Sequence, residues 1–405
     1  MNEVRALIEA FDEACVRGER CALATVVSVE GSSYRRPGAR MLVCEGGAST
    51  GTISAGCLES DVIEHAKRVI KAGEALLVEY DTASTTEEMV WGLGLGCNGI
   101  VRVLVEPLAP SSLYIEALRR SCGAHAEVAT VSVATVYQHT PSELAPDEGR
   151  VETGARLFIN DQGEGSREKL SDRVASVLES EVRTLSLGGE TSGARVYGVD
   201  GGSVKVFVET LLPPVPLVVF GAGHDALPVV ELARGLGWQT EVVDPQAHPA
   251  SRPRFVMADR VTLSRPEDVA ARVSITPRTL TLLMSHNYSH DRALLGFLLA
   301  SPARYIGVMG PRKRTERMLS ELAAGKDMPR LEEAGLARLH SPAGLDIGAN
   351  APAEIALSII AEMRAVLDGR RGGMLRERRG SIHSSQSDGG RAPLMEEQAL
   401  RVALA

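Results

Sequence analysis

The chain lacks an excess of basic residues, which argues against a nucleic-acid binder. Lys and Arg number 44 against 52 Asp and Glu, a formal net charge of −8. No apolar run approaches the length that crosses a bilayer. The first residues, Met1-Asn-Glu-Val-Arg, do not open an uninterrupted apolar stretch, so no secretory signal is predicted. What remains is the composition of an ordinary soluble globular protein, 44% hydrophobic and 24% charged.

Paired cysteines are missing as well. The chain has 6 cysteines and none of them lies in a C-x-x-C pair; they are Cys15, Cys21, Cys44, Cys57, Cys97 and Cys122. We therefore expect neither a disulfide framework nor a structural zinc site. Together with the missing secretory signal, this predicts a cytoplasmic protein in a reducing compartment.

The length of 405 residues predicts two or three domains of the α/β class. The pattern of residues 1–108 predicts a first α/β domain. Residues 111–212 are predicted to form a less regular α/β segment, and they contain no chemical motif. Residues 213–216, Pro-Pro-Val-Pro, are typical of a linker. Residues 215–367 alternate strand and helix, which predicts a Rossmann-like parallel sheet with helices on both faces. Residues 368–405 mix Gly, Ser and Arg without periodicity and are predicted to be disordered.

One loop in the carboxy-terminal domain has the pattern of a dinucleotide-binding turn. The stretch Gly221-Ala-Gly223-His224-Asp-Ala226 fits G-x-G-x-x-A between an apolar strand and a helix. Asp244 ends the next predicted strand, where an acidic residue can bind a ribose hydroxyl. The alternative is a tight strand-to-helix turn without a ligand. The pattern indicates a phosphorylated heterocycle more firmly than it indicates which one.

Two further turns should meet that loop at the carboxyl edge of the sheet. Ser285 and His286 follow one apolar strand, and Gly310-Pro-Arg312 follows the last one and opens a helix. Cations beside a helix N-terminus make a good anion site. A solvated basic face is the competing interpretation for residues 312–314, and a structural histidine is the competing one for His286.

Two cysteines lie in glycine-rich turns near the amino terminus. Cys57 is in Gly51-Thr-Ile-Ser-Ala-Gly-Cys57, and Cys97 is in Gly92-Leu-Gly-Leu-Gly-Cys97. Glycine lets a ligand approach the main chain closely, and a soft sulfur in such a turn can meet a metal. The alternative is a pair of free thiols buried as small hydrophobic groups.

These motifs together resemble the xanthine dehydrogenase accessory factor family of the XdhC/CoxI type. The resemblance covers the amino- and carboxy-terminal blocks and only loosely the middle segment. Two departures are Ala55 and Asn98, where we would expect glycine beside each cysteine. The matching words are Gly31-Ser-Ser-Tyr-Arg-Arg-Pro-Gly-Ala-Arg-Met41, Ser54-Ala-Gly-Cys-Leu-Glu59, Gly94-Leu-Gly-Cys-Asn-Gly99, Phe220-Gly-Ala-Gly-His-Asp-Ala226, Met284-Ser-His286, Tyr305-Ile-Gly307, Gly310-Pro-Arg312, Gly344-Leu-Asp-Ile-Gly348 and Gly380-Ser-Ile-His383.

The resemblance implies an accessory factor and not an enzyme. Such a protein binds the molybdenum cofactor, protects it during sulfuration and inserts it into a xanthine dehydrogenase-type apoenzyme. A cysteine desulfurase would donate the sulfur, and the protein would act as a homodimer. We expect Cys57 and Cys97 at the metal end of the cofactor. The remaining candidate cofactor-binding residues are Gly221, Gly223, His224, Asp244, Ser285, His286, Gly310 and Arg312.

Two other functions stay open. The Gly221 to Asp244 pattern also fits an NAD-dependent oxidoreductase with His286 as proton donor, although no separate acid–base constellation stands out in the middle segment. A redox-responsive regulatory module would use a reversible Cys57–Cys97 disulfide. That disulfide requires the two α-carbons to lie within roughly 7 Å.

Overall fold

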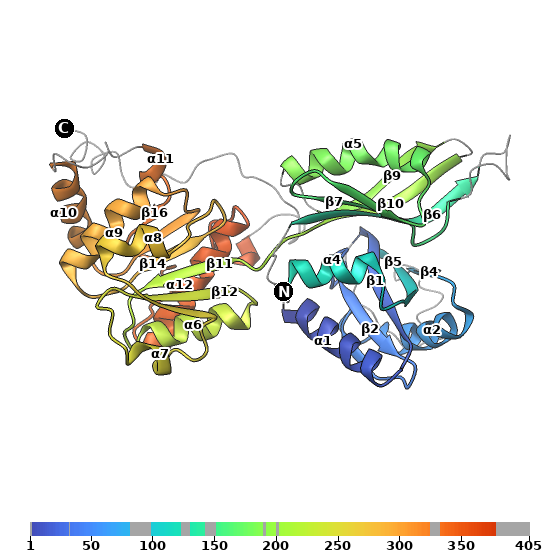
Figure 1. Ribbon diagram of the computed structural model, residues 1–405, viewed down its shortest axis with the longest axis horizontal. Coiled ribbons are helices and arrows are strands. Elements are labelled where there is room, and N and C mark those ends of the chain that lie inside the picture. The colour runs from blue at the N-terminus through green and yellow to red at the C-terminus, as the bar shows by residue number, and fades with distance from the viewer. Residues whose placement is uncertain are drawn as a thin grey trace. The chain divides into compact units, whose positions relative to one another are not determined.

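The chain folds into two compact units, Met1–Pro213 and Pro214–Ala405. The computed structural model describes residues 2–31, 33–81, 99–122, 130–141, 151–188, 192–199, 202–324 and 333–377 (Figure 1). Cys97, Asn98 and residues 378–405 of the segment predicted to be disordered, 368–405, lie outside these ranges; residues 368–377 of that segment are described and include a 3-10 turn at Leu375–Glu377. Among the described residues, no helix is both long and apolar enough to cross a bilayer.

The first unit starts with a five-stranded antiparallel sheet, here called sheet A, with strand order β3-β2-β1-β5-β4. Its central strand is buried over its first eight residues, which are apolar except for Thr25 and Ser28, as expected of a strand covered on both faces. Two helices bury apolar residues spaced three and four apart against it. The elements are α1 (Asn2–Val16), β1 (Cys21–Gly31), β2 (Arg40–Cys44), β3 (Ser49–Gly51), α2 (Glu59–Ala72), β4 (Leu76–Asp81) and β5 (Gly99–Leu108).

The rest of the first unit forms a second antiparallel sheet, sheet B, with strand order β8-β7-β6-β10-β9. Helix α5 covers one face of this sheet (Figure 1). The order of elements along the chain repeats that of sheet A. They are α4 (Leu113–Ser121), β6 (Val131–Pro141), β7 (Arg156–Asn160), β8 (Gly165–Glu168), α5 (Asp172–Gly188), β9 (Gly193–Val199) and β10 (Gly202–Leu211).

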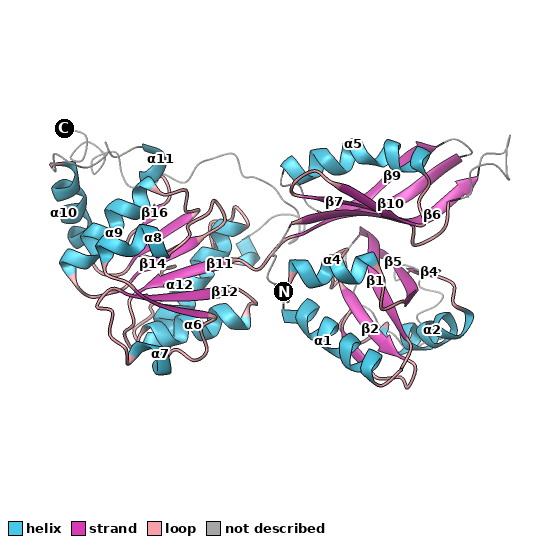
Figure 2. Ribbon diagram, in the orientation of Figure 1, coloured by secondary structure: helices cyan, strands magenta, loops and turns pink. Residues whose placement is uncertain are grey.

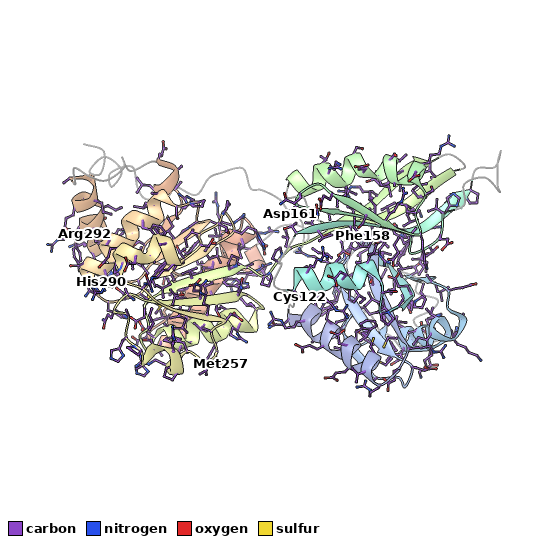
Figure 3. All side chains as sticks on the ribbon, in the orientation of Figure 1. Cys122, Phe158, Asp161, Met257, His290 and Arg292 are labelled. Carbon is purple, nitrogen blue, oxygen red and sulfur yellow. The ribbon has the colours of Figure 1, made fainter. Side chains whose placement is uncertain are left out.

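An apolar layer joins the two sheets of the first unit. Leu7 and Phe11 of α1 pack in one cluster with Leu118 of α4 and with residues of both sheets. Cys122, which follows α4, and Phe158 of β7 belong to the same cluster and are labelled in Figure 3. The middle segment is therefore an integral part of the unit that contains the Cys57 turn.

The second unit is a six-stranded parallel sheet with the order β13-β12-β11-β14-β15-β16. Along β11, Leu217 and Val219 face α6 and α12, while Val218 and Phe220 face α9 and α10. Helices thus cover both faces (Figure 2), and the predicted Rossmann-like fold is confirmed. Its strands are β11 (Pro216–Phe220), β12 (Gln239–Asp244), β13 (Arg260–Leu263), β14 (Leu280–Leu283), β15 (Tyr305–Val308) and β16 (Leu339–His340).

The order of these strands reverses between β11 and β14, so the loops after both strands open at the same carboxyl edge. Gly221, Ser285 and Gly310 all follow strands at this edge. The helices of the unit are α6 (Ala226–Gly235), α7 (Ser251–Arg254), α8 (Val269–Arg272), α9 (Tyr288–Ala300), α10 (Arg312–Ala323), α11 (Glu333–Leu336) and α12 (Pro352–Leu367), with short 3-10 turns at Pro266–Asp268 and Leu375–Glu377.

Candidate functional site

Gly221 is the point where the chain leaves β11 at the switch of strand order. Its φ is 139°, and its N–H donates to the carbonyl oxygen of Val243 at 2.9 Å. A Cβ at this position would lie 2.4 Å from the carbonyl oxygen of Met284. Only glycine fits here, because the backbones after β11 and β14 touch. The turn therefore needs its glycine for packing whether or not a ligand binds.

The next residues of this turn contact the loop after β14. Nε2 of His286 lies 2.6 Å from Oδ2 of Asp225, so the Asp225 carboxylate accepts a hydrogen bond from the imidazole. The His286 side chain remains 63% exposed, and its φ of 58° is rare for a residue other than glycine. A Cβ on Gly223 would lie 2.4 Å from Oδ1 of the same aspartate. The structure thus brings Gly223 and His286 together, with His224 exposed on the same turn.

A second chain of polar contacts connects the loop after β14 to the one after β15. The Ser285 hydroxyl donates to Oδ1 of Asp291 at 2.5 Å, and Nη2 of Arg314 lies 2.8 Å from Oδ2 of that aspartate. Asp291 is buried, so its charge is balanced by Arg314. Arg312, the predicted ligand, is the first residue of α10 and is exposed. Gly310, with φ of 108°, allows the turn into that helix.

Three residues of this edge were not predicted as site residues: Asp225, Asp291 and Arg314. Asp225 lies inside the G-x-G-x-x-A motif at a position that the motif leaves open. Asp291 and Arg314 lie on the first turns of α9 and α10, and only the packing of these helices shows that they pair. The sequence signal that could have identified Arg314 was its place in the cationic run 312–314, directly after the predicted anion-binding turn at Gly310.

Asp244 is held by its own turn. Its carboxylate is buried and accepts bonds from the N–H groups of Gln246 and His248, both at 2.9 Å, and from the Ser251 hydroxyl at 2.6 Å. A ribose hydroxyl would have to share an oxygen that already accepts these bonds. The ribose-binding role of Asp244 stays a prediction, and its structural role in the turn after β12 is evident.

The charge at this edge suits an anion. Helices α6, α9 and α10 all begin there, and free N–H groups at helix N-termini carry partial positive charge. Arg312 and Lys313 add cations at the N-terminus of α10, where they oppose the helix dipole unless an anion binds. Nη1 of Arg254 donates to the carbonyl oxygen of Ala222 at 2.7 Å and braces the glycine turn from the side of α7.

The Cys57 turn lies in the first unit, between β3 and α2. Oε1 of Glu59 accepts from the N–H groups of Ile53 and Ser54, at 3.3 and 2.9 Å, and Oε2 accepts from the Ser54 hydroxyl. Burial alone would raise the pKa of the Glu59 carboxyl; these hydrogen bonds outweigh it, so the pKa lies below its ordinary value. The carboxylate is therefore ionised at neutral pH and holds the start of the turn.

Ser54 also closes the turn from within. Its oxygen accepts from the N–H groups of Gly56 and Leu58, at 3.2 and 3.1 Å. The left-handed conformation falls on Gly56, with φ of 108°, and not on Ala55. The alanine that stands where we expected glycine is thus accommodated. Cys57 is half-buried near the end of this turn, directly before Leu58 at the N-cap of α2.

The structure places other cysteines in the core. Sγ of Cys21 lies 3.3 Å from Sγ of Cys44 across β1 and β2. Burial, with the neighbouring thiol, raises the pKa of Cys21 to about 12, which makes it a poor nucleophile. Within the described ranges, no group of three or more His, Cys, Asp or Glu is arranged to hold a metal. Cys97, the second predicted metal ligand, lies outside those ranges.

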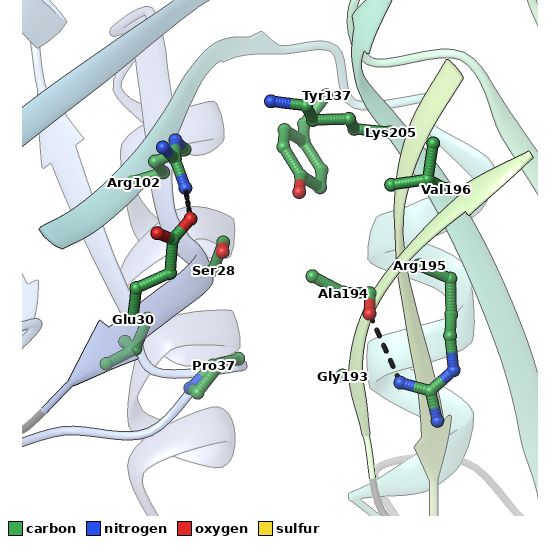
Figure 4. Close-up of a pocket in the computed structure, with 11 residues that line it drawn as sticks. Ser28, Glu30, Pro37, Arg102, Tyr137, Gly193, Ala194, Arg195, Val196 and Lys205 are labelled. Carbon is green, nitrogen blue, oxygen red and sulfur yellow. Dashed lines mark hydrogen bonds and ion pairs between the residues drawn. The ribbon is translucent and has the colours of Figure 1, made fainter. Parts of the chain in front are cut away.

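A cavity of about 390 Å³ opens between the two sheets of the first unit (Figure 4). Its polar lining includes Arg102 of β5, which pairs with Glu30 and with Glu79, the latter at 2.6 Å. Tyr137 and Lys205 of sheet B line the opposite side. Of the predicted site residues that the structure describes, none lines this cavity.

Comparison with known protein families gives a match in each of the two units. The XdhC and CoxI family model matches residues 14–81, and the XdhC Rossmann domain matches residues 217–363. A Bacillus subtilis protein named as a probable xanthine dehydrogenase subunit is 31% identical over 348 residues, which cover 85% of this chain and 92% of that protein. The molybdenum cofactor insertion chaperone PaoD of Escherichia coli is 21% identical, with 90% and 89% covered.

A solved structure agrees with these matches. A crystal structure described as that of a xanthine dehydrogenase from Bacillus halodurans has a TM-score of 0.68 and 29% identity, and the match covers 90% of this chain and 97% of that one. The likeness extends over both units, including the middle segment for which neither family model gives a match. The glycine turns, the fold and these relatives agree: the chain belongs to the XdhC and CoxI family.

Proposed function

We propose that this protein binds the molybdenum cofactor, supports its sulfuration and inserts it into a xanthine dehydrogenase-type apoenzyme. The observation that carries the proposal is the Cys57 turn, which holds a half-buried thiol in place through Ser54 and Glu59. A thiol in a rigid, open turn can meet a soft metal without reorganisation. Relatives named for xanthine dehydrogenase and for molybdenum cofactor insertion support the same role.

Each unit, taken by itself, has residues that suit one chemical group of such a cofactor. Cys57 would meet the metal end, with Cys97 as its expected partner. In the second unit, the carboxyl edge of the Rossmann sheet would suit a phosphate group, because three helix N-termini and Arg312 supply positive charge there. When bound, the cofactor supplies the oxo-transfer chemistry of the client enzyme; this chain's residues bind it, orient it and shield it from water.

The partners follow from this role. We propose a xanthine dehydrogenase-type apoenzyme as the acceptor, a cysteine desulfurase as the sulfur donor and a homodimer as the working form. Membership of the family supports the acceptor, the sulfur donor and the homodimer.

An NAD-dependent oxidoreductase is the second candidate, favoured by one observation. The Asp225–His286 pair lies beside Gly223 at the edge where a nicotinamide would bind, and a carboxylate-paired imidazole can transfer a proton. Calorimetry with NAD separates the candidates: tight binding with hydride transfer to a small substrate would favour the oxidoreductase.

The test of the proposed function is transfer to a client enzyme. Protein loaded with sulfurated cofactor should restore turnover to a cofactor-free molybdenum hydroxylase better than free cofactor at the same concentration, because the bound terminal sulfur is protected. The Cys57→Ser protein, prepared in the same way, should not restore turnover above the level reached with free cofactor. The proposal is wrong if loaded protein never exceeds free cofactor and holds neither molybdenum nor pterin after purification from a host that makes the cofactor.

A further inference from the structure

Sheets A and B are two copies of one fold within a single chain. In the first copy, the Gly38 N–H donates to the carbonyl oxygen of Val26 at 2.8 Å; in the second, the Gly154 N–H donates to that of Val136 at 2.8 Å. Each glycine is followed by Ala-Arg and then by an apolar strand, β2 or β7. The local sequence and the hydrogen-bond pattern therefore coincide at the same place in both sheets.

The irregularities of the two sheets coincide as well. The pairing of β1 with β5 shifts by one residue between Val26 and Ser28, and that of β6 with β10 shifts after Val136. Both strands are 11 residues long, and both shifts follow their sixth residue. A bulge at the same point of two unrelated sheets would be a coincidence, whereas it follows naturally from a duplicated fold.

The two copies are joined by a reciprocal pair of buried ion pairs. Arg40 of the first copy pairs with Glu209 of the second, and Arg156 of the second pairs with Glu106 of the first. The arginines follow the equivalent Gly-Ala dipeptides. The glutamates lie at the same position of β5 and β10, opposite the third residue of β1 and of β6.

The apolar contacts between the copies have the same reciprocity. Val27 and Tyr137 are the bulged residues of the two long strands, and they form one cluster with Leu104 and Phe207, which are each the sixth residue of β5 and of β10. Arg102 and Lys205, fourth in those strands, line the cavity between the sheets (Figure 4). Each copy thus buries the surface that the other presents, as the two halves of a two-fold dimer do.

The copies differ where the first carries its cysteine. Residues 52–58 join β3 to α2, whereas residues 169–171 suffice to join β8 to α5. Gly51 and Arg167 occupy equivalent register positions, opposite the second residues of β2 and β7. Counted from these positions, residues 52–58 of the first copy correspond to residues 168–171 of the second, so the first copy has three extra residues in this turn. The fold closes in the second copy without these extra residues. Ile53 and Leu58 of the first copy belong to its hydrophobic core, so the part of the turn that the fold does not require lies between them and includes Cys57.

We infer that the first unit is a fused pseudo-dimer in which the first copy alone binds the molybdenum-bearing ligand, through the longer turn that carries Cys57. The second copy has a structural role. It covers the interface of the first copy and has no ligand-binding turn at the equivalent place. The ligand in this inference rests on the proposed function.

The test shortens the turn in the full-length protein. Ala55, Gly56 and Cys57 are deleted, which leaves four residues between Gly51 and α2, as in the second copy, and keeps the core residues Ile53 and Leu58. Molybdenum content is measured by mass spectrometry after purification from a host that makes the cofactor. We expect molybdenum content to fall at least tenfold while the melting temperature stays within about 3 °C of the parent. Cys57→Ser, which keeps the length of the turn, should give the same loss of molybdenum. Lys169→Gly, in the equivalent connection of the second copy, should leave the content unchanged.

The outcomes separate this inference from the proposed function. If the parent retains molybdenum and both the shortened and the Cys57→Ser proteins retain as much, the inference is overturned and the proposed function survives. If the shortened protein does not fold, the turn belongs to the core of the first copy and the inference is again overturned. If Lys169→Gly loses the metal, the second copy takes part in binding and the inference is wrong. A parent without molybdenum or pterin overturns the proposed function, and the ligand assignment with it.

Discussion

Sγ of Cys57 lies 3.7 Å from the hydroxyl oxygen of Ser54, the same oxygen that accepts two backbone N–H groups of the turn. The proton of that hydroxyl goes to Glu59. A thiol near the end of the turn is therefore connected through one serine to a carboxylate at the start of α2. This connection fixes the position of the sulfur more tightly than the glycines around it would suggest.

Replacing Ser54 by alanine should loosen this turn. The change leaves the N–H groups of Gly56 and Leu58 without their acceptor, so we expect a loss of about 1 kcal/mol in the free energy of unfolding and a clear fall in molybdenum content. Ser112→Ala is the matched control, because Ser112 caps α4 through the Tyr114 N–H. It should cost similar stability and leave molybdenum content unchanged. Equal loss of metal in both proteins would contradict the assignment.

The cysteines should differ in reactivity. At pH 8 the Cys21 thiol, with its pKa raised to about 12, is almost entirely protonated, so alkylation there is slow. Cys57 is half-buried at a turn and should be alkylated first. Peptide mapping after timed exposure to iodoacetamide measures both rates. Because the pKa of Cys21 lies well above this pH range, its thiolate fraction rises about tenfold for each pH unit, so raising the pH toward 10 should speed alkylation of Cys21 steeply while most of its thiol stays protonated. Faster labelling of Cys21 than of Cys57 would contradict this.

The reciprocal ion pairs should stabilise the first unit through mutual neutralisation. Glu106→Gln leaves the buried Arg156 guanidinium without its carboxylate, and we expect a loss of about 3–5 kcal/mol in the free energy of unfolding. The exposed pair Arg20–Glu45 is the matched control: Glu45→Gln should cost less than about 1 kcal/mol. Urea titration measures both. If the two costs are alike, the buried pair does not hold the copies together.

Gly221 should tolerate no side chain. A Cβ would approach the Met284 carbonyl oxygen to 2.4 Å in a residue with φ of 139°, so Gly221→Ala should force β11 and β14 apart at their carboxyl ends. We expect a lower melting temperature and loss of any ligand at this edge. Gly235→Ala, at the end of α6, meets nothing within 4 Å and should be neutral or stabilising by up to about 1 kcal/mol. Calorimetric melting of both variants is the measurement, and a stable Gly221→Ala protein would refute the packing argument.

Much of the second unit could be predicted from local patterns. The run Leu217 to Ala226 carries its own strand, turn and helix start, and such signals depend on neighbours in sequence. The motif could not show that Asp244 is engaged by its own turn, since that depends on where Ser251 folds back. It also could not show that Asp225 meets His286, because 61 residues separate them.

In the sequence, only one short match indicates the duplication in the first unit. Gly38-Ala-Arg40 and Gly154-Ala-Arg156 match, but the flanking residues have diverged, and the corresponding connections of the two copies differ in length. Burial patterns alone are shared by any two half-buried antiparallel sheets, so they could not mark the copies as related.

The sequence by itself determined the α/β class, the family and the position of the Cys57 turn. Glycine turns, cysteines and the alternation of strands and helices can be identified from residues that are close together in the sequence. Tertiary structure alone decided that Arg40 pairs with Glu209 and Arg156 with Glu106, that Ser54 and Glu59 brace the thiol, and that the middle segment is a second copy of the first. The physical reason is distance along the chain. Burial makes a charge seek a partner, but only the packing of the two sheets decides which partner lies within reach.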